Sequence, residues 1–194
     1  MSKKYKLIDH DGSKAPKSLK QIKALRDIPN IGVKKEDLGG FVESEKNLSQ
    51  DGDCWVFGLA QVYGKAWVFG SAQVYGSAQV YGSAQISGEA QVYGEAWVYG
   101  SARVCGSAWV CGSARVCGDD QIESSNDLLN IITFKSYPIT ITRDNVTIGC
   151  KTMRRKELFK ITEKKSIRMG LPKGLYKEYK AHLKHGFKIV KERK

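Results

Sequence analysis

The chain has 194 residues, of which 41% are hydrophobic and 10% aromatic, and 32 Lys and Arg against 20 Asp and Glu give a net charge of +12. Such a chain is long and apolar enough to bury a core, which excludes a disordered polypeptide. No apolar run is long enough to cross a bilayer, no hydrophobic signal segment follows Met1, and the five cysteines are odd in number. We therefore expect a cytoplasmic protein with no membrane partner and no disulfide framework.

The charge divides the chain into three regions. Residues 1–41 carry 10 basic and 5 acidic side chains, residues 42–131 carry 4 and 10, and residues 132–194 carry 18 and 5. An acidic middle region therefore lies between two basic ends. A partner attracted by positive charge is expected to bind one of these ends, chiefly the C-terminal region. We expect an N-terminal cap over 1–41, a repeat domain over 42–131 and a basic C-terminal region over 132–194.

The first region contains two segments with strand-like alternation. Residues 5–8 read Tyr-Lys-Leu-Ile, and a second alternating segment runs from residue 18 to residue 28. The end of a stack of strands exposes unpaired backbone groups and apolar core, so it must be covered. These segments are predicted to form a β-hairpin that covers the front of the following repeat.

The middle of the chain repeats every six residues. From Cys54 to Asp119 there are eleven consecutive units of the type Ala-Gln-Val-Tyr-Gly-Ser, followed by a degenerate twelfth unit, DQIESS. The upstream segments VESEKN and LSQDGD are interpreted as staying in phase, and Leu128 lies six residues after Ile122. A regular six-residue period over this length indicates a repeat architecture.

The six residues of each unit predict a short strand and a corner. The first residue is small and the third is β-branched, so both face the same side of a strand, and Gly with a polar residue then supplies turn chemistry. Three such units close a coil of 18 residues with three flat faces, an interior of Ala with Val or Ile, and parallel strands in successive coils. The predicted fold is mainly β, a parallel β-helix of about five coils over residues 42–131.

These units resemble the hexapeptide-repeat superfamily of left-handed parallel β-helices, and the resemblance implies the left-handed coil. The segment from Asp37 to Ser49, DLGGFVESEKNLS, also resembles the entry segment of small β-helix proteins common in phages and prophages. In those proteins a variable basic tail that begins with a hairpin follows the solenoid. This second resemblance implies little about activity.

The resemblance raises two enzymatic functions that the residues here do not support. Acyltransferases of the superfamily use a histidine on a coil beside an extruded loop, and its γ-class carbonic anhydrases bind zinc through histidines on adjacent coils. The only histidines are His10, His182 and His185, and no loop interrupts Cys54–Gly118. Cys105, Cys111 and Cys117 occupy three different faces and cannot converge on one metal ion. We expect a protein that is not an enzyme, with no catalytic residue, cofactor or metal.

Outward-facing aromatic residues form ladders, because residues 18 apart stack in adjacent coils. Such ladders stabilise stacked strands by themselves, but a contiguous aromatic face is also typical of an interface. Ser87 and Cys105 interrupt the ladder of Trp67 and Phe69 on the third face, so the other two faces are the better candidates. We expect a homo-oligomer, a dimer or trimer, or a protein partner, at a face formed by Trp55, Phe57, Tyr75, Tyr93, Tyr63, Tyr81 and Tyr99.

The last region predicts a hairpin followed by helices. Residues 138–149 read as two strands around Arg143-Asp-Asn145, and helices are expected near 154–164 and 173–191. In the second helix, Tyr176, Tyr179, Leu183, Phe187 and Val190 form an apolar stripe, and a lysine follows each of them one residue later. The lysines are either a solvated face or a strip for a polyanion or an acidic partner, made of Arg154, Arg155, Lys156, Lys177, Lys180, Lys184 and Lys188. A membrane-surface helix is the weaker alternative.

The outward Tyr of earlier coils becomes Cys105, Cys111 and Cys117 in the last full coil. The shorter side chain on all three faces indicates close packing by the C-terminal hairpin and helices. Docking through Tyr179, Leu183 and Phe187 is expected to leave the lysines outward as an electropositive surface.

Three functions remain open. The first is a non-enzymatic interaction protein of phage or prophage type, whose rigid β-helix binds a macromolecular host partner, conceivably as an inhibitor of a bacterial defence system. The second is a nucleic-acid-binding or scaffolding protein that uses the basic C-terminal segment. The third is a degenerate hexapeptide acyltransferase.

Overall fold

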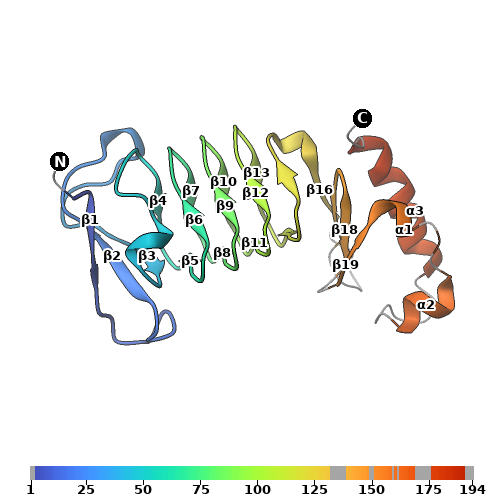
Figure 1. The fold of residues 1–194 in the computed structure, drawn as a ribbon, viewed down its shortest axis with the longest axis horizontal. Helices are drawn as coiled ribbons and strands as arrows, with labels where there is room; N and C mark the ends of the chain where they lie inside the picture. The colour runs from blue at the N-terminus through green and yellow to red at the C-terminus, as the bar shows by residue number, and fades with distance from the viewer. Residues whose placement is uncertain are drawn as a thin grey trace.

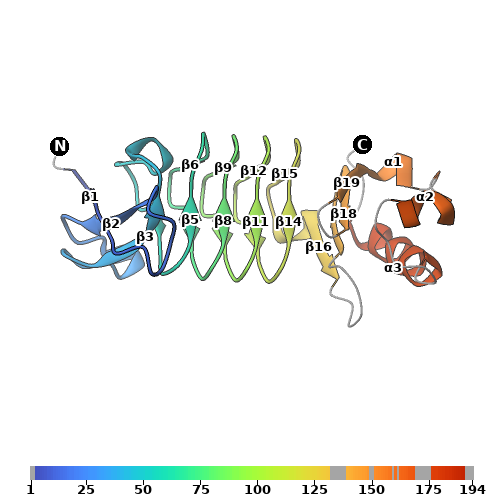
Figure 2. The same ribbon diagram turned by 90° about the horizontal axis from the view of Figure 1, so that it is seen from below.

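The computed structural model describes residues 3–131, 139–148, 151–158, 160, 162–168 and 176–190. It is mainly β, a parallel solenoid of about five turns with few helices (Figure 1). The N-terminal strands lie at one end of the resulting rod, and a separate antiparallel sheet lies at the other end together with the helices (Figure 2). In the described part of the chain, no helix has the length and apolar character to cross a membrane.

The solenoid strands lie on three faces, and those from β4 to β15 are two residues long. One sheet contains β3 (Leu38–Val42), β5, β8, β11 and β14 in parallel, a second contains β4, β7, β10 and β13, and a third contains β6, β9, β12 and β15. From β4 onwards, neighbouring strands are 18 residues apart, and their backbones bond between coils, as in Gln79 N–H to Ala96 O at 2.9 Å. The strands are β4 (Trp55–Val56), β5 (Gln61–Val62), β6 (Trp67–Val68), β7 (Gln73–Val74), β8 (Gln79–Val80), β9 (Gln85–Ile86), β10 (Gln91–Val92), β11 (Trp97–Val98), β12 (Arg103–Val104), β13 (Trp109–Val110), β14 (Arg115–Val116) and β15 (Gln121–Ile122).

The interior and the corners follow the predicted roles of the six positions. The Val, Ile and Ala of the units are fully or almost fully buried and form one continuous core along the rod. At the corners, glycines adopt positive φ, and a Cβ on Gly100 would lie 2.8 Å from the backbone nitrogen of Gly118 in the next coil. Glycine is therefore required both by its backbone conformation and by the close stacking of the corners.

The first coil corrects the expectation that the upstream segments stay in phase with the repeat. Val42 pairs with Val62 and Leu48 bridges Val68, a separation of 20 residues instead of 18. Gly52 nevertheless stacks on Gly70 with the regular spacing. Two extra residues, Gln50 and Asp51, therefore lie between the strand position of Leu48 and the corner.

The N-terminal strands extend one solenoid sheet. β1 (Tyr5–Ile8) pairs antiparallel with β2 (Lys20–Ala24), β2 pairs antiparallel with β3 (Leu38–Val42), and β3 pairs parallel with β5. Tyr5, Ile22 and Ile28 join the same core as the solenoid valines. Two short 3-10 helices, η1 (Pro29–Ile31) and η2 (Glu45–Asn47), complete this end.

The rod ends in an antiparallel sheet. β15 is the last solenoid strand, and after η3 (Ser125–Asp127) the chain forms β16 (Leu128–Ile131), β17 (Ile139–Thr142), β18 (Asn145–Ile148) and β19 (Lys151–Arg154). Leu128 keeps the six-residue phase, but β16 pairs antiparallel with β17 and does not continue a parallel sheet. The prediction that the parallel β-helix continues to residue 131 is therefore wrong for this strand, because phase alone does not specify the strand's partner.

In the described part of the chain, three helices follow the last strand. They are α1 (Arg155–Leu158), α2 (Glu163–Arg168) and α3 (Tyr176–Ile189). The expected helix near 154–164 is instead the end of β19 followed by two short helices. The extended conformation of Lys151–Arg154 is stabilised by its pairing with β18, a contact that helix propensity does not include.

Candidate functional site

The C-terminal sheet presents two different faces. Ile139, Ile141 and Val146 are buried in an apolar cluster with Leu183 and Val190 of α3. The alternating residues of β17 and β18 are instead threonines, which are also buried. Because alternate residues of a strand face opposite sides, one face binds the helix and the threonine face packs against the last coil.

Threonine hydroxyls form hydrogen bonds with polar groups of the last coil of the solenoid. The Arg115 N–H on the edge strand β14 donates to Thr140 Oγ1 at 2.9 Å. Cys117 Sγ lies 2.7 Å from Thr152 Oγ1 and 3.7 Å from Thr147 Oγ1. Cys117 is buried by these contacts, whereas Cys105 and Cys111 are half-exposed. Side-chain oxygens thus replace a further parallel strand at this edge.

Asp120 ties the last coil to the threonine face. It occupies the inward position that is Ala or Cys in the eleven preceding units, and it is 1% exposed. Its Oδ1 accepts hydrogen bonds from Thr142 Oγ1 at 2.6 Å and Asn145 Nδ2 at 2.9 Å. Its Oδ2 is buried and has no hydrogen-bond partner among the described residues. The interruption of the Ala pattern in DQIESS was the available sequence signal for this role, and the interpretation of the unit as degenerate missed it.

Burial raises the pKa of the Asp120 carboxyl, and the hydrogen bonds from Thr142 and Asn145 oppose that shift only in part. In the unfolded chain the carboxyl titrates near about 3.9. Stability is therefore lost as pH rises from that value through the higher pKa of the folded state. We expect Asp120→Asn to be more stable than the parent at pH 7, with the difference shrinking as pH falls towards 4, measured by urea unfolding across this range.

Asp119→Asn is the matched control for this prediction. The exposed Asp119 carboxylate pairs with Arg154 at 2.7 Å, and the hydrogen bond from Arg154 lowers its pKa. Its stabilising effect is present at neutral pH and lost on acidification, so this variant should show the opposite trend. A stability difference for Asp120→Asn that grows on acidification would contradict the role given to its buried carboxyl.

Arg155 corrects the predicted basic strip. It is 4% exposed, and its guanidinium donates to Val190 O at 2.6 Å, Arg143 O at 3.2 Å and Phe187 O at 3.2 Å. The guanidinium carbon also lies 4.2 Å from the centre of the Phe187 ring. Arg155 therefore holds the C-terminal turn of α3 against the β17–β18 turn and is not available to a partner.

The other residues of the strip form two groups: Arg154 and Lys156 near α1, and four lysines on α3. Arg154 is exposed but pairs with Asp119, and Lys156 is exposed on α1. The four lysines of α3 are exposed, on a side of the helix about 100° away from the buried Leu183 and Val190. Phe187 is half-buried, whereas the side chains of Tyr179 and His182 lie outside the described residues. The lysines in the second group are Lys177, Lys180, Lys184 and Lys188.

The tyrosine rings of each ladder stack on one another between successive coils of the rod. Tyr63, Tyr81 and Tyr99 stack with ring centres 5.1 Å apart, and Tyr75 stacks on Tyr93 at 4.9 Å. Their rings are half-buried, and Phe57 meets Tyr75 edge-on at 6.5 Å.

Tyrosine hydroxyls also connect successive coils. Tyr63 Oη donates to Gln79 Oε1 at 3.2 Å and Tyr75 Oη donates to Gln91 Oε1 at 2.7 Å. The ladders therefore stabilise the stack of coils directly.

Trp55 does not belong to the candidate interface, which corrects its predicted exposure. It is 1% exposed, and Tyr5 of β1 packs edge-on against it with ring centres 6.2 Å apart. The exposed tryptophans are Trp67 and Trp109, at 42% and 51%. A ladder position defines which way a side chain points, but the N-terminal strand that covers Trp55 is contributed from 50 residues away in sequence.

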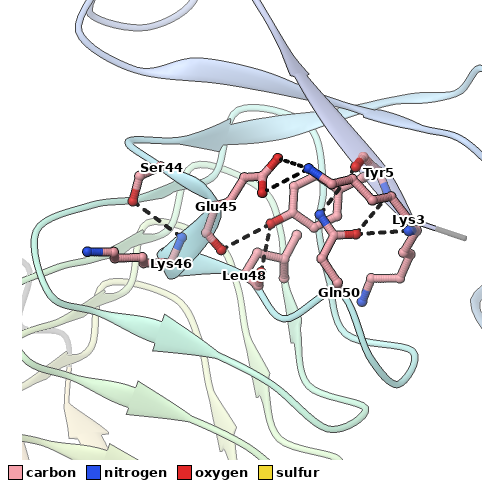
Figure 3. Close-up of polar contacts among 8 residues, drawn as sticks. Lys3, Tyr5, Ser44, Glu45, Lys46, Leu48 and Gln50 are labelled. Carbon is pink, nitrogen blue, oxygen red and sulfur yellow. Dashed lines mark hydrogen bonds and ion pairs between the residues drawn. The ribbon is translucent and has the colours of Figure 1, made fainter. Parts of the chain in front are cut away.

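Gln50, one of the two extra residues of the first coil, forms hydrogen bonds with the N-terminal strand (Figure 3). Gln50 Oε1 accepts from the N–H groups of Lys4 at 2.8 Å and Tyr5 at 3.2 Å, and Gln50 Nε2 donates to Tyr5 O at 3.2 Å. Tyr5 Oη donates to Leu48 O at 2.7 Å, and Lys3 pairs with Glu45 at 2.8 Å. Hydrogen bonds from the inserted Gln50 thus hold the backbone of the N-terminal strand against the first coil.

Lys4 is fully buried beside Cys54. Its Nζ donates to Cys54 O at 2.9 Å, Gly52 O at 3.2 Å and Asp51 O at 3.3 Å, and lies 3.2 Å from Cys54 Sγ. Burial lowers the pKa of the Lys4 amine and raises that of the Cys54 thiol. Hydrogen bonds to the three carbonyl oxygens offset the cost of burying the Lys4 amine, so its role is structural.

Among the described residues, no group of three or more His, Cys, Asp or Glu side chains could hold a metal ion.

Sequence comparison supports the solenoid. Residues 60–76 and 90–106 match the family model described as the YdcK beta solenoid repeat. A search of curated proteins finds no match to the chain. The matched segments are strands and corners of the rod, so the similarity concerns the repeat.

Proposed function

We propose that this chain is a non-enzymatic interaction protein in which a rigid β-solenoid holds a basic C-terminal module for a macromolecular partner. The observation that carries the proposal is the way α3 is fixed. Its apolar side is buried on β17 and β18, Arg155 bonds its last turn, and its four lysines remain exposed. A helix that is fixed on one side and charged on the other is a surface of defined position.

The rod supports the same proposal. Its interior is filled by Val, Ile and Ala, and its coils are tied by backbone bonds and by tyrosine–glutamine contacts on the outside. No histidine lies within residues 42–131, so the general base used by hexapeptide acyltransferases has no equivalent there. A titration with acetyl-CoA is expected to show no binding and tests the third candidate function.

Finer features of the proposal come from the family resemblance. We propose a left-handed coil, N- and C-terminal segments that act as caps, a phage or prophage type of protein, and a cytoplasmic location in the bacterial host. The partner would then be a host complex, and inhibition of a defence system is the biological role that fits such a protein.

Affinity capture from bacterial lysate, with and without nuclease, tests the proposed function. Capture of one protein complex in a nuclease-resistant manner would support the leading function, and capture that nuclease abolishes would support the nucleic-acid function. The matched control is a chain in which Lys177, Lys180, Lys184 and Lys188 are replaced by Gln, because it keeps the rod unchanged. Failure to retain any defined macromolecule would contradict both functions.

We also propose that the chain associates through a rod face. Changing Tyr75 and Tyr93 to Lys should convert a dimer or trimer into monomers, because two charges would be buried in the contact. Light scattering measures the mass, and Gln85→Lys with Ser87→Lys places the same charge on the third face as a control. A parent protein that is monomeric at high concentration would show that the ladder serves only the rod.

A further inference from the structure

We infer that the exposed lysines of α3 form a binding strip for the phosphate backbone of a double-stranded nucleic acid. The strip consists of Lys177, Lys180, Lys184 and Lys188. This inference rests on the proposed function, since it names the partner class of the same C-terminal module. It differs from the sequence prediction in its residues, because Arg155 is buried and Arg154 pairs with Asp119.

The helix places these lysines in a line. They recur at intervals of three or four residues, so they lie within one narrow stripe and extend over about 16 Å of helix axis. The adjacent side of α3, about 100° from the lysines, is anchored by Leu183 and Val190 in the apolar cluster, and the bonds from Arg155 hold the helix end. The helix backbone that carries the four lysines is therefore fixed relative to the C-terminal sheet. The spacing of the lysines along the helix is the same before and after a ligand binds.

The character of the strip favours a polyanion over an acidic protein. Protein interfaces depend on a desolvated centre of several aromatic or apolar anchors. Among the described side chains of α3, the exposed neighbours of the lysines are the small Ala181, the polar His185 and, at the helix end, Ile189, which is 53% exposed and is the one large apolar residue among them. A row of ammonium groups matches a ligand whose negative charges repeat along a line. Lysine also binds phosphate as a point charge without requiring one fixed orientation.

The strip also favours duplex over single strands. Single-strand binding depends on aromatic side chains that stack on bases. On α3, Tyr176 and Phe187 are half-buried and already contact cations: Lys180 Nζ lies 5.4 Å from the Tyr176 ring centre, and Arg155 lies against Phe187. Contacts to phosphate alone give binding without base specificity, and duplex DNA has the higher charge density.

The inference makes a quantitative prediction about salt. Four phosphate contacts give a slope of about −3.6 for log K against log salt, so Kd should weaken about 150-fold between 50 and 200 mM salt. Fluorescence anisotropy with a labelled duplex of about 20 base pairs, roughly three times the length that α3 spans, measures this slope. DNA and RNA duplexes of the same sequence are separate arms, with a single strand as the third.

Charge-matched variants locate the contact. Replacing the four lysines by Gln keeps helix propensity and should bring the slope close to zero, and Lys184→Gln alone should reduce it by about 0.9. The control removes the same charge from the other end of the rod through Lys14, Lys17, Lys34 and Lys35, which are exposed and have no ion pair in the described structure. That variant should bind like the parent.

Three results would overturn the inference: no binding at 50 mM salt, equal weakening by the control variant, or tighter binding of the single strand than of either duplex. These outcomes are separate from failure of the proposed function. If lysate capture yields a nuclease-resistant protein partner whose binding requires the same lysines, the interaction function stands and the nucleic-acid assignment is wrong.

Discussion

Replacing Val80 with Asp is expected to abolish folding of the middle coils. Val80 is fully buried and pairs with Val62 and Val98 in the adjacent coils, so the new carboxylate would lie in the rod interior without a partner. Burial of an unpaired charge costs about 4–5 kcal/mol or more, which is a large part of the stability of a typical domain. Urea unfolding followed by circular dichroism, with solubility on expression, measures the effect.

The control for this change is Ser83→Asp. Ser83 is exposed at a corner only three residues away, so the same charge there remains in water. A folded Val80→Asp variant with a urea midpoint close to that of Ser83→Asp would contradict the inward register of the solenoid. Conversely, loss of folding in both variants would show that charge near this coil, and not burial, is responsible.

Replacing Arg155 with Ala is expected to release α3 while leaving the rod folded. The change removes donors to the carbonyl oxygens of Val190, Phe187 and Arg143 and leaves these acceptors in a mostly buried environment. Hydrogen bonds to a charged group contribute about 1.5–3 kcal/mol, so the module should lose about 3 kcal/mol or more. Hydrogen exchange with mass spectrometry should show faster exchange in α3 and unchanged protection in the solenoid.

Arg154→Ala is the matched control, because it removes the neighbouring charge from an exposed ion pair. An exposed pair contributes little to stability because water screens it, so exchange in α3 should stay close to that of the parent. Equal effects of the two substitutions would mean that Arg155 is not the residue that fixes the helix. The Arg155→Ala variant should also bind duplex more weakly, since the lysines would no longer be held in one orientation.

The solenoid could be predicted from the sequence because each of its features is local. A small residue, a β-branched residue two positions later and a glycine at the corner specify which side chains face inward, and identical units repeat that geometry. The parallel pairing at 18-residue spacing then follows, and the structure contains it. The helical stripe of α3 was predictable for the same reason, since helix geometry alone separates Leu183 from Lys184.

The tertiary structure decided the features that depend on contacts between remote segments. Trp55 is buried by a strand about 50 residues earlier, and the bonds of Arg155 to the end of α3 span 32 and 35 residues. Asp120 acquires its role only when the threonine face of β17 and β18 covers the last coil. A periodic sequence specifies the direction of each side chain, but burial, pairing and accessibility depend on which distant residues come to lie against it.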